Sequence, residues 1–316
     1  MILIYIILFI ASFFILSFAS KWLVASLSKI ARFLGWKEFV VAFFVMALAG
    51  AVPNLSIGIS SALHGISQLS LSDIIGGNII DLTAVIALGV LISKNGLRAN
   101  GRTVRKSAIF VLFLAFLPLI LMLDGVISRI DGVILILIFF VYSFWLFGKR
   151  RRFHKSYHNG NRTTFKNIFK NFFFLFGSLI LLLLAAEGIV RSATYFSIAL
   201  NLPLVLIGIL IVGLGNALPE MFFTIQAAKK SKGRMIIGNL MGSIIFLMTL
   251  VLGIVALISP IKVDDFSPFV IGRFFLIVSA VLFFIFLKTG EKITKKEAWI
   301  LLFVYIAFVA TEIFFY

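Results

Sequence analysis

Long apolar runs, separated by short polar stretches, recur along almost the whole chain. A helix needs about 20 residues to cross the hydrocarbon core of a membrane, and ten runs come close to that length. The first has no basic residue ahead of it and no small-residue cleavage pattern, which favours a membrane helix over a signal peptide. The pattern therefore predicts an all-α, polytopic membrane protein with ten transmembrane helices. They cover residues 2–20, 39–63, 73–93, 107–124, 130–147, 171–195, 203–228, 235–259, 269–287 and 297–315.

The charged residues fall between the predicted helices and set the expected orientation. Of the 316 residues, 62% are hydrophobic and 13% charged, and the net charge is +17. All but four of the 29 Lys and Arg residues follow the first, third, fifth, seventh or ninth run. Because basic loops remain in the cytoplasm, we expect these loops to be cytoplasmic and the N-terminus to lie outside. The basic charge is thus a topology signal and does not indicate nucleic-acid binding.

A basic polar stretch at residues 148–170 divides the chain into two halves, 1–147 and 171–316, each with five predicted helices. An odd number of crossings per half turns the second half upside down relative to the first, as in many secondary transporters. We therefore expect two inverted five-helix repeats joined by a cytoplasmic linker.

The two halves also resemble each other in sequence. Segment 19–90 aligns with segment 185–256 without a gap, and both a proline and a glycine match. Each residue of the first segment pairs with the residue at the same place in the second, as residue 19 pairs with residue 185. We call this constant separation along the chain the repeat offset. This register indicates an internal duplication. Two motif pairs carry it: ALAGAVPNL at 47–55 with GLGNALPEM at 213–221, and SDIIGGNI at 72–79 with GNLMGSII at 238–245.

The matched prolines, Pro53 and Pro219, stand in the middle of predicted helices. A proline removes one backbone hydrogen bond and crowds the carbonyl four residues earlier, so we expect both helices to break near the middle of the membrane. The polar residues that follow, Asn54 and Glu220, would be costly against lipid and are expected to face a cation site. The small residues before each proline could instead serve close helix packing. Glu220 favours the functional interpretation, because no Lys or Arg follows it in its helix until Lys229.

The third and eighth predicted helices offer further oxygen atoms. Asn78 and Asp81, three residues apart, share one helical face, and Asp73 lies about a turn and a half nearer the outer end. Asn239 and Ser243 also share a face, and they suit either a cation or interhelical hydrogen bonds. The third helix therefore contributes the stronger candidates.

Other acidic residues have plainer interpretations. Glu187 precedes Arg191 by four residues, which predicts a helical ion pair near the outer surface. Glu312 lies near the end of the last helix. The remaining acids are expected to be solvated at or near outer loops: Asp124, Asp131, Asp264 and Asp265.

The paired motifs resemble the two alpha repeats of the calcium/cation antiporter superfamily, which carry a GTSLPEL-like and then a GNxxGSNxxN-like stretch in each half. The second half of this chain matches better, and LVASLSKIARFLGWKEFVV at 23–41 is similar to the family's lead-in to its first repeat. The resemblance covers the whole architecture and implies a sodium/calcium exchanger-like antiporter with a central cation site. Carried over position by position, it implicates Asn54, Asn78, Glu220 and Ile244, with Asp81 at the end of the second stretch. The predicted metal ligands are Glu220, Asn78, Asp81, Asn54, Ser243 and Asn216.

The chain departs from the family pattern in ways that bear on the ion. Asn54 replaces a glutamate and Ile244 replaces an amide or acid; other replacements affect threonines (Gly50, Asn216) and serines (Ala51, Ala217). Calcium prefers about 6 to 8 oxygen ligands including carboxylates, whereas one carboxylate with neutral oxygens suits Na⁺ or H⁺. The expected cargo is therefore Ca²⁺, Na⁺ or both, with H⁺ also open.

Three function classes remain to be compared. We expect a secondary antiporter in a prokaryotic cell membrane, whose partners are inorganic cations and the lipid bilayer. The alternatives are a sodium- or proton-coupled antiporter that has lost calcium binding, and a transport-inactive scaffold or sensor. The chain has no Cys and no HExxH or GxSxG motif, which disfavours an enzyme, and no cofactor is expected. The oligomeric state is left open.

Overall fold

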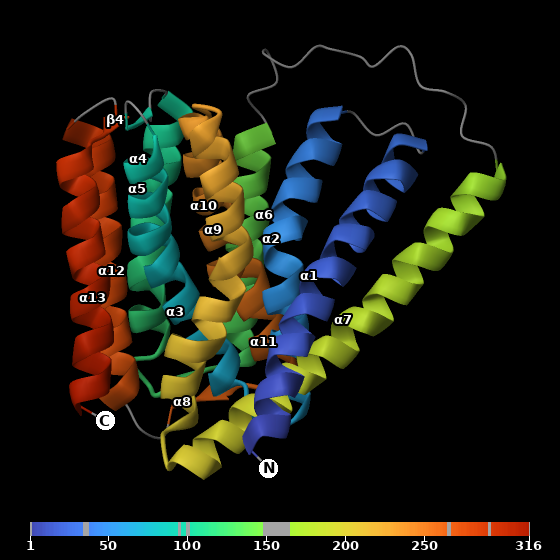
Figure 1. The fold of residues 1–316 in the computed structure, drawn as a ribbon, viewed down its shortest axis with the longest axis horizontal. Coiled ribbons are helices and arrows are strands. Elements are labelled where there is room, and N and C mark those ends of the chain that lie inside the picture. Colours follow the sequence, from blue (N-terminus) through green and yellow to red (C-terminus); the bar gives the residue numbers. More distant parts are fainter. Residues whose placement is uncertain are drawn as a thin grey trace.

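The fold, obtained as a computed structural model, is almost entirely helical (Figure 1). Long apolar helices are favoured because each satisfies its own backbone hydrogen bonds, as hydrocarbon requires. The structure describes residues 2–33, 38–93, 96–98, 102–147, 165–263, 267–289 and 292–315. The first half contains α1 (Ile2–Phe33), α2 (Glu38–Leu63), α3 (Gln68–Ile80), η1 (Asp81–Val85), α4 (Ile86–Ile92), β1 (Leu97–Arg98), α5 (Arg102–Leu121), β2 (Val126–Ile127) and α6 (Arg129–Phe147).

The second half repeats this order of long helices. It contains α7 (Phe165–Leu200), α8 (Leu204–Leu206), η3 (Ile207–Val212), α9 (Gly213–Lys229), α10 (Gly233–Phe246), η4 (Leu247–Val251), α11 (Leu252–Ile258), β3 (Ile261–Lys262), α12 (Ser267–Thr289), β4 (Lys292–Ile293) and α13 (Lys295–Phe315). The elements labelled η are short π-helical segments that continue the neighbouring α-helices.

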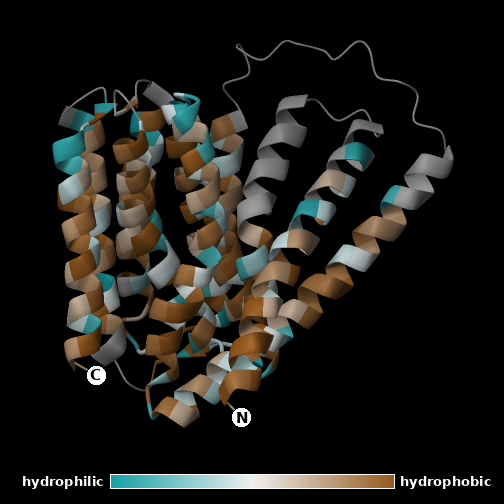
Figure 2. Cartoon of the chain, viewed as in Figure 1, coloured by the Kyte–Doolittle hydropathy of each residue, from teal (hydrophilic) through white to brown (hydrophobic). Residues whose placement is uncertain are grey.

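Within the described residues, eight helical stretches are long and apolar enough to cross a membrane, and Ala51–Leu63 forms a shorter apolar helix. Hydrophobic residues extend along the helices, while hydrophilic residues are frequent at the upper helix ends (Figure 2). The runs predicted at 39–63 and 107–124 correspond to α2 and α5. Most of the predicted linker at 148–170 lies outside the described residues, as do Asp264 and Asp265, and α7 already begins at Phe165.

Two long helices, α1 and α7, pack along each other on one side of the molecule (Figure 1). The rings of Tyr5 and Tyr195 stack with their centroids 3.9 Å apart. Buried residues of these helices, such as Leu16 and Ile189, form an apolar cluster with residues of α2, α3 and η3, distinct from the larger core. Helix α2 contacts both α1 and α7 and joins them to that core.

Two short antiparallel strand pairs connect the halves outside the long helices. Strand β1 pairs with β4, with Leu97 opposite Ile293, and β2 pairs with β3, with Ile127 opposite Ile261. Each pair takes one strand from each half, so both ends of the larger bundle are tied across the halves. These strands are a small departure from the all-helical prediction.

The same backbone irregularity occurs in both halves. The π-helical segments η1 and η4 begin at Asp81 and Leu247, which are separated by the repeat offset. In each, a buried threonine hydroxyl donates to the carbonyl four residues earlier: Thr83 to Ile79 and Thr249 to Ile245. The backbone therefore repeats in the same register as the two sequence motifs. The π-helical turns were not predicted from the sequence.

Candidate functional site

The six predicted ligands lie on α2, α3 with η1, α9, and α10; α9 contacts the other three parts, and α2 contacts both α3 and α10. All are buried, with at most 7% of any of these residues exposed. Polar side chains are rarely buried to this degree unless they are paired or bind a ligand. The six are Asn54 on α2, Asn78 and Asp81 at the end of α3 and the start of η1, Asn216 and Glu220 on α9, and Ser243 on α10.

Several polar atoms of this group have no protein partner. Both amide atoms of Asn78, one carboxylate oxygen each of Asp81 and Glu220, and the Ser243 hydroxyl are buried without a hydrogen bond. A buried polar group that lacks a partner costs about 1–3 kcal/mol. The unpartnered oxygen atoms of this group are therefore best explained by a bound ligand, whereas the Asn78 nitrogen is a donor that a cation would not satisfy.

The acidic members of the site interact electrostatically. The charge of Glu220 acts on Asp81, and that of Asp73 acts on Glu220. Among the described residues, however, no three His, Cys, Asp or Glu side chains are grouped closely enough to hold a metal ion. A cation here would consequently need amide, hydroxyl or backbone oxygens in addition to carboxylates.

Asp73 is the acidic residue that the predicted ligand set omitted. It is fully buried, and the Asn216 amide nitrogen lies 2.8 Å from its Oδ1 and 2.9 Å from its Oδ2. The two residues are 143 positions apart and come from different halves. The sequence did place an acid at residue 73 in an apolar run, but only the fold brings it to Asn216.

Glycines allow α3 to approach the η3–α9 helix closely. A methyl group on Gly76 would collide with the backbone of Ile209, and one on Gly213 would lie 2.9 Å from the Gly77 nitrogen. Small residues permit such backbone contact between membrane helices. The contact holds Asp73 and Asn78 of α3 against α9.

The prediction that both prolines break their helices is wrong. Helix α2 continues through Pro53 and α9 through Pro219. A proline lacks the N–H that would bond the carbonyl four residues earlier, which for Pro219 belongs to Gly215. Each helix therefore loses one backbone hydrogen bond at its proline but keeps helical geometry on both sides of it.

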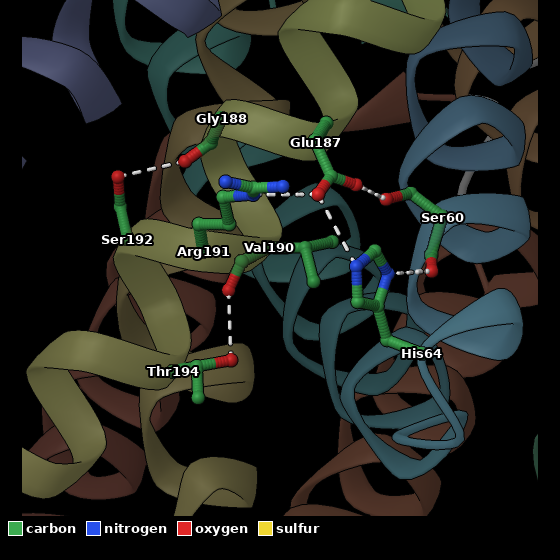
Figure 3. A network of polar contacts seen from close by, with 8 residues as sticks. All are labelled: Ser60, His64, Glu187, Gly188, Val190, Arg191, Ser192 and Thr194. Carbon is green, nitrogen blue, oxygen red and sulfur yellow. Dashed lines mark hydrogen bonds and ion pairs between the residues drawn. The ribbon is translucent and has the colours of Figure 1, made fainter.

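The ion pair predicted between Glu187 and Arg191 is confirmed, with Arg191 Nε 2.6 Å from Glu187 Oε1. Figure 3 shows that the same carboxylate also faces α2. The Ser60 hydroxyl donates to Glu187 Oε2 at 2.9 Å, and His64 Nε2 lies 3.2 Å from Oε1. This cluster links α7 to the end of α2.

Glu312 lies near the end of the last helix, as expected, but its burial was not predicted. It is completely buried on α13, and neither carboxylate oxygen has a hydrogen-bond partner. A methyl group on Gly272 of α12 would lie 3.9 Å from its Oε1. No local pattern indicated this burial, because the packing of α13 against α12 is a tertiary feature.

Comparison with known proteins places the fold and this constellation in context. The family model described as "Sodium/calcium exchanger protein" matches residues 4–148 and 170–314, one segment in each half. An uncharacterized membrane protein of Methanocaldococcus jannaschii is 27% identical over 96% of both chains. The sodium/calcium exchanger MaX1 of Methanosarcina acetivorans is 24% identical, covering 92% of this chain and 93% of its own.

A solved structure leads to the same family. The sodium-calcium exchanger NCX_Mj, in crystals soaked with Na⁺, superimposes with a TM-score of 0.64 at 25% identity over 98% of this chain and 99% of its own. These relatives are transporters or membrane proteins spanning nearly the full length of this chain. With the family model matching both halves, the chain belongs to the sodium/calcium exchanger family of the calcium/cation antiporter superfamily.

Proposed function

We propose that this protein is a secondary active antiporter that moves cations by alternating access through a midplane site around Glu220. One observation carries the proposal: Asp81 and Glu220, from different halves, each present a buried oxygen without a protein partner, beside the unpartnered amide of Asn78. In a membrane interior such groups mark ion pathways by default. The proposed ligands are Glu220, Asp81, Asn78, Asn216, Ser243 and Asn54.

The proposed architecture is ten transmembrane helices in two inverted five-helix repeats, residues 1–147 and 171–316. The repeat offset supports it: besides η1 and η4, it relates β2 to β4 and the first residue of α6 to that of α13. The exchanged strand pairs also fit a two-fold relation, since β1–β4 maps onto β3–β2. Inverted repeats would give the site two equivalent approaches, one from each side of the membrane.

The helix contacts suggest which parts move. Helices α1 and α7 pack along each other, and their apolar cluster also includes residues of α2, α3 and η3; α2, α3, α9 and α10 carry the site. We propose that the pair slides against this core and exposes the site to alternate sides. By the distribution of basic residues, the 148–170 loop would be cytoplasmic and the N-terminus outside.

Calcium exchanged against sodium is the cargo that this site favours. Asp73 adds a third buried carboxylate near Glu220. The negative charge of Asp73 compensates for the neutral side chain of Asn54, because a divalent cation needs negative ligands. The apolar, 2%-exposed Ile244 instead favours the second candidate, a sodium- or proton-coupled antiporter of monovalent cations. Both candidates use Glu220.

The test is ⁴⁵Ca²⁺ uptake into Na⁺-loaded proteoliposomes that contain the purified protein. We expect sodium-dependent uptake that Glu220→Gln reduces to about a hundredth or less, because losing one charged ligand at about 3 kcal/mol changes an equilibrium by that factor. The control is Asp124→Asn, whose carboxylate only accepts the Val126 N–H in an exposed loop.

The other outcomes of this test either support the monovalent candidate or contradict the proposed site. Without calcium uptake, the same vesicles are assayed for ²²Na⁺ flux driven by a proton gradient, and Glu220-dependent flux there establishes the monovalent candidate. If neither flux occurs, or if Glu220→Gln leaves the flux intact, the proposed site is wrong.

A further inference from the structure

The contact between Asp73 and Asn216 determines which way the Asn216 amide faces. An ionised carboxylate only accepts hydrogen bonds, whereas an amide has a donating nitrogen and an accepting oxygen. With both Asp73 oxygens within 2.9 Å of one amide atom, that atom must be the nitrogen. The hydrogen bonds to Asp73 thus fix which end of the Asn216 amide faces this carboxylate.

The Asn216 oxygen is consequently left with no partner. It is buried and accepts no hydrogen bond. Asn216 precedes Glu220 by four residues, so the two side chains lie on the same face of α9. An amide oxygen beside a carboxylate in a buried position is a ligand type suited to Na⁺ or Ca²⁺.

We propose that Asp73 is a positioning residue: it holds the nitrogen of Asn216, so that the Asn216 oxygen is presented to the transported cation beside Glu220. This inference rests on the proposed function and assigns a specific task to a residue outside the ligand set. The same carboxylate also adds a negative charge near Glu220. The ligand class is a hard, oxygen-binding cation.

This arrangement joins Asp73 of the first half to Asn216 of the second half, and it has no counterpart at the positions related by the repeat offset. At the repeat offset, the counterpart of Asp73 is Asn239 and that of Asn216 is Gly50. Glycine has no amide to position, so an acid at the position of Asn239 would have no such partner. The acid–amide pair therefore exists at Asp73 and Asn216 but not at the equivalent positions, Asn239 and Gly50.

The experiment is a double-mutant cycle on cation affinity, measured by isothermal titration calorimetry of the purified protein with Ca²⁺ and, separately, Na⁺. Removing the partner that orients a metal ligand typically weakens binding about 10–100-fold. We expect Asp73→Ala and Asn216→Ala each to weaken binding by about tenfold or more. The double variant should be no worse than the weaker-binding single variant, because Asp73 acts through Asn216.

Ser72→Ala is the matched control, since Ser72 is adjacent on α3 but donates only to the Leu69 carbonyl; it should bind like the wild type. If Asp73→Ala does not fold, Asp73→Ser, which keeps a hydroxyl that accepts an N–H, should bind with intermediate affinity. Additive losses in the cycle, or wild-type affinity in both Asp73 variants, overturn the positioning role while leaving the antiporter proposal intact. A wild-type protein that binds neither cation overturns both.

Discussion

The two halves of the chain share backbone devices but differ in the chemistry they bring to the site. Both have a buried threonine within a π-helical turn, Thr83 and Thr249, in the same register. Their polar groups do not match: the counterpart of Glu220 is Asn54, that of Asn78 is Ile244 and that of Asp81 is Leu247. The second half offers its carboxylate after a proline, and the first half offers its carboxylates on α3 and η1.

This difference shows which properties depend on symmetry. Helix packing and the exchanged strand pairs involve backbone geometry, and the halves share the η1 and η4 turns, although among the described residues η3 occurs in the second half only. A cation responds to the total set of oxygens around it, and that set can come unequally from the two halves. A polar residue lost on one side can be replaced by another on a neighbouring helix.

The largest expected effect breaks a close contact between the halves to which only one of two matched glycines contributes. Gly76→Ala would place a methyl group on the backbone of Ile209, whereas a methyl group on its counterpart Gly242 would meet no described atom of another element within 4 Å. Because backbone atoms cannot move aside alone, we expect Gly76→Ala to cost about 3 kcal/mol or more and to abolish transport. Gly242→Ala should behave like the wild type. Thermal unfolding in detergent measures both, and equal stability of the two variants would contradict the packing difference.

The next effect concerns the last helix of each half. The buried, unpartnered Glu312 of α13 corresponds to Leu146 of α6. Replacing an unsatisfied buried carboxyl group by an apolar one of similar size removes a cost of about 1–3 kcal/mol. Glu312→Leu should therefore raise the melting temperature in detergent and leave uptake unchanged. A lower melting temperature or lost transport would mean that the carboxyl group has a role in binding or proton transfer.

A third variant makes the site more symmetric. Asn54→Glu gives the first half the carboxylate that Glu220 supplies in the second. If calcium is the cargo, the added charge should tighten calcium binding by about tenfold, equivalent to about 1.4 kcal/mol. Calorimetric titration with Ca²⁺ and with Na⁺ distinguishes a gain in calcium affinity from a gain in affinity for both cations. Weaker calcium binding would indicate that the carboxylates already present, Asp73 included, supply all the charge the site accepts.

The smallest expected effect concerns the threonine hydrogen bond that both halves share. Thr83→Val and Thr249→Val each remove one hydroxyl that bonds a helix carbonyl. A single such bond contributes about 0.5–1.5 kcal/mol, so both variants should be slightly and equally less stable in thermal unfolding. A large loss from Thr83→Val alone would show that its π-helical turn also holds Asp81 in place.

Part of this picture follows from the sequence alone. The apolar runs predict helices because hydrocarbon admits little else, and the described long helices lie where those runs are. The Glu187–Arg191 pair was predictable because four residues along a helix bring two side chains together. The repeat offset was also visible in the sequence, because it depends only on the order of residues along the chain.

Only the tertiary structure decided how residues far apart in the chain meet. It brought Asp73 to Asn216, buried Glu312 against α12 and set Gly76 on the backbone of Ile209. It also showed that α2 and α9 continue through their prolines. The sequence determined which segments form long apolar helices and which carry oxygen atoms. Which oxygen atoms face one another depends on contacts between the halves, and local sequence patterns do not encode these.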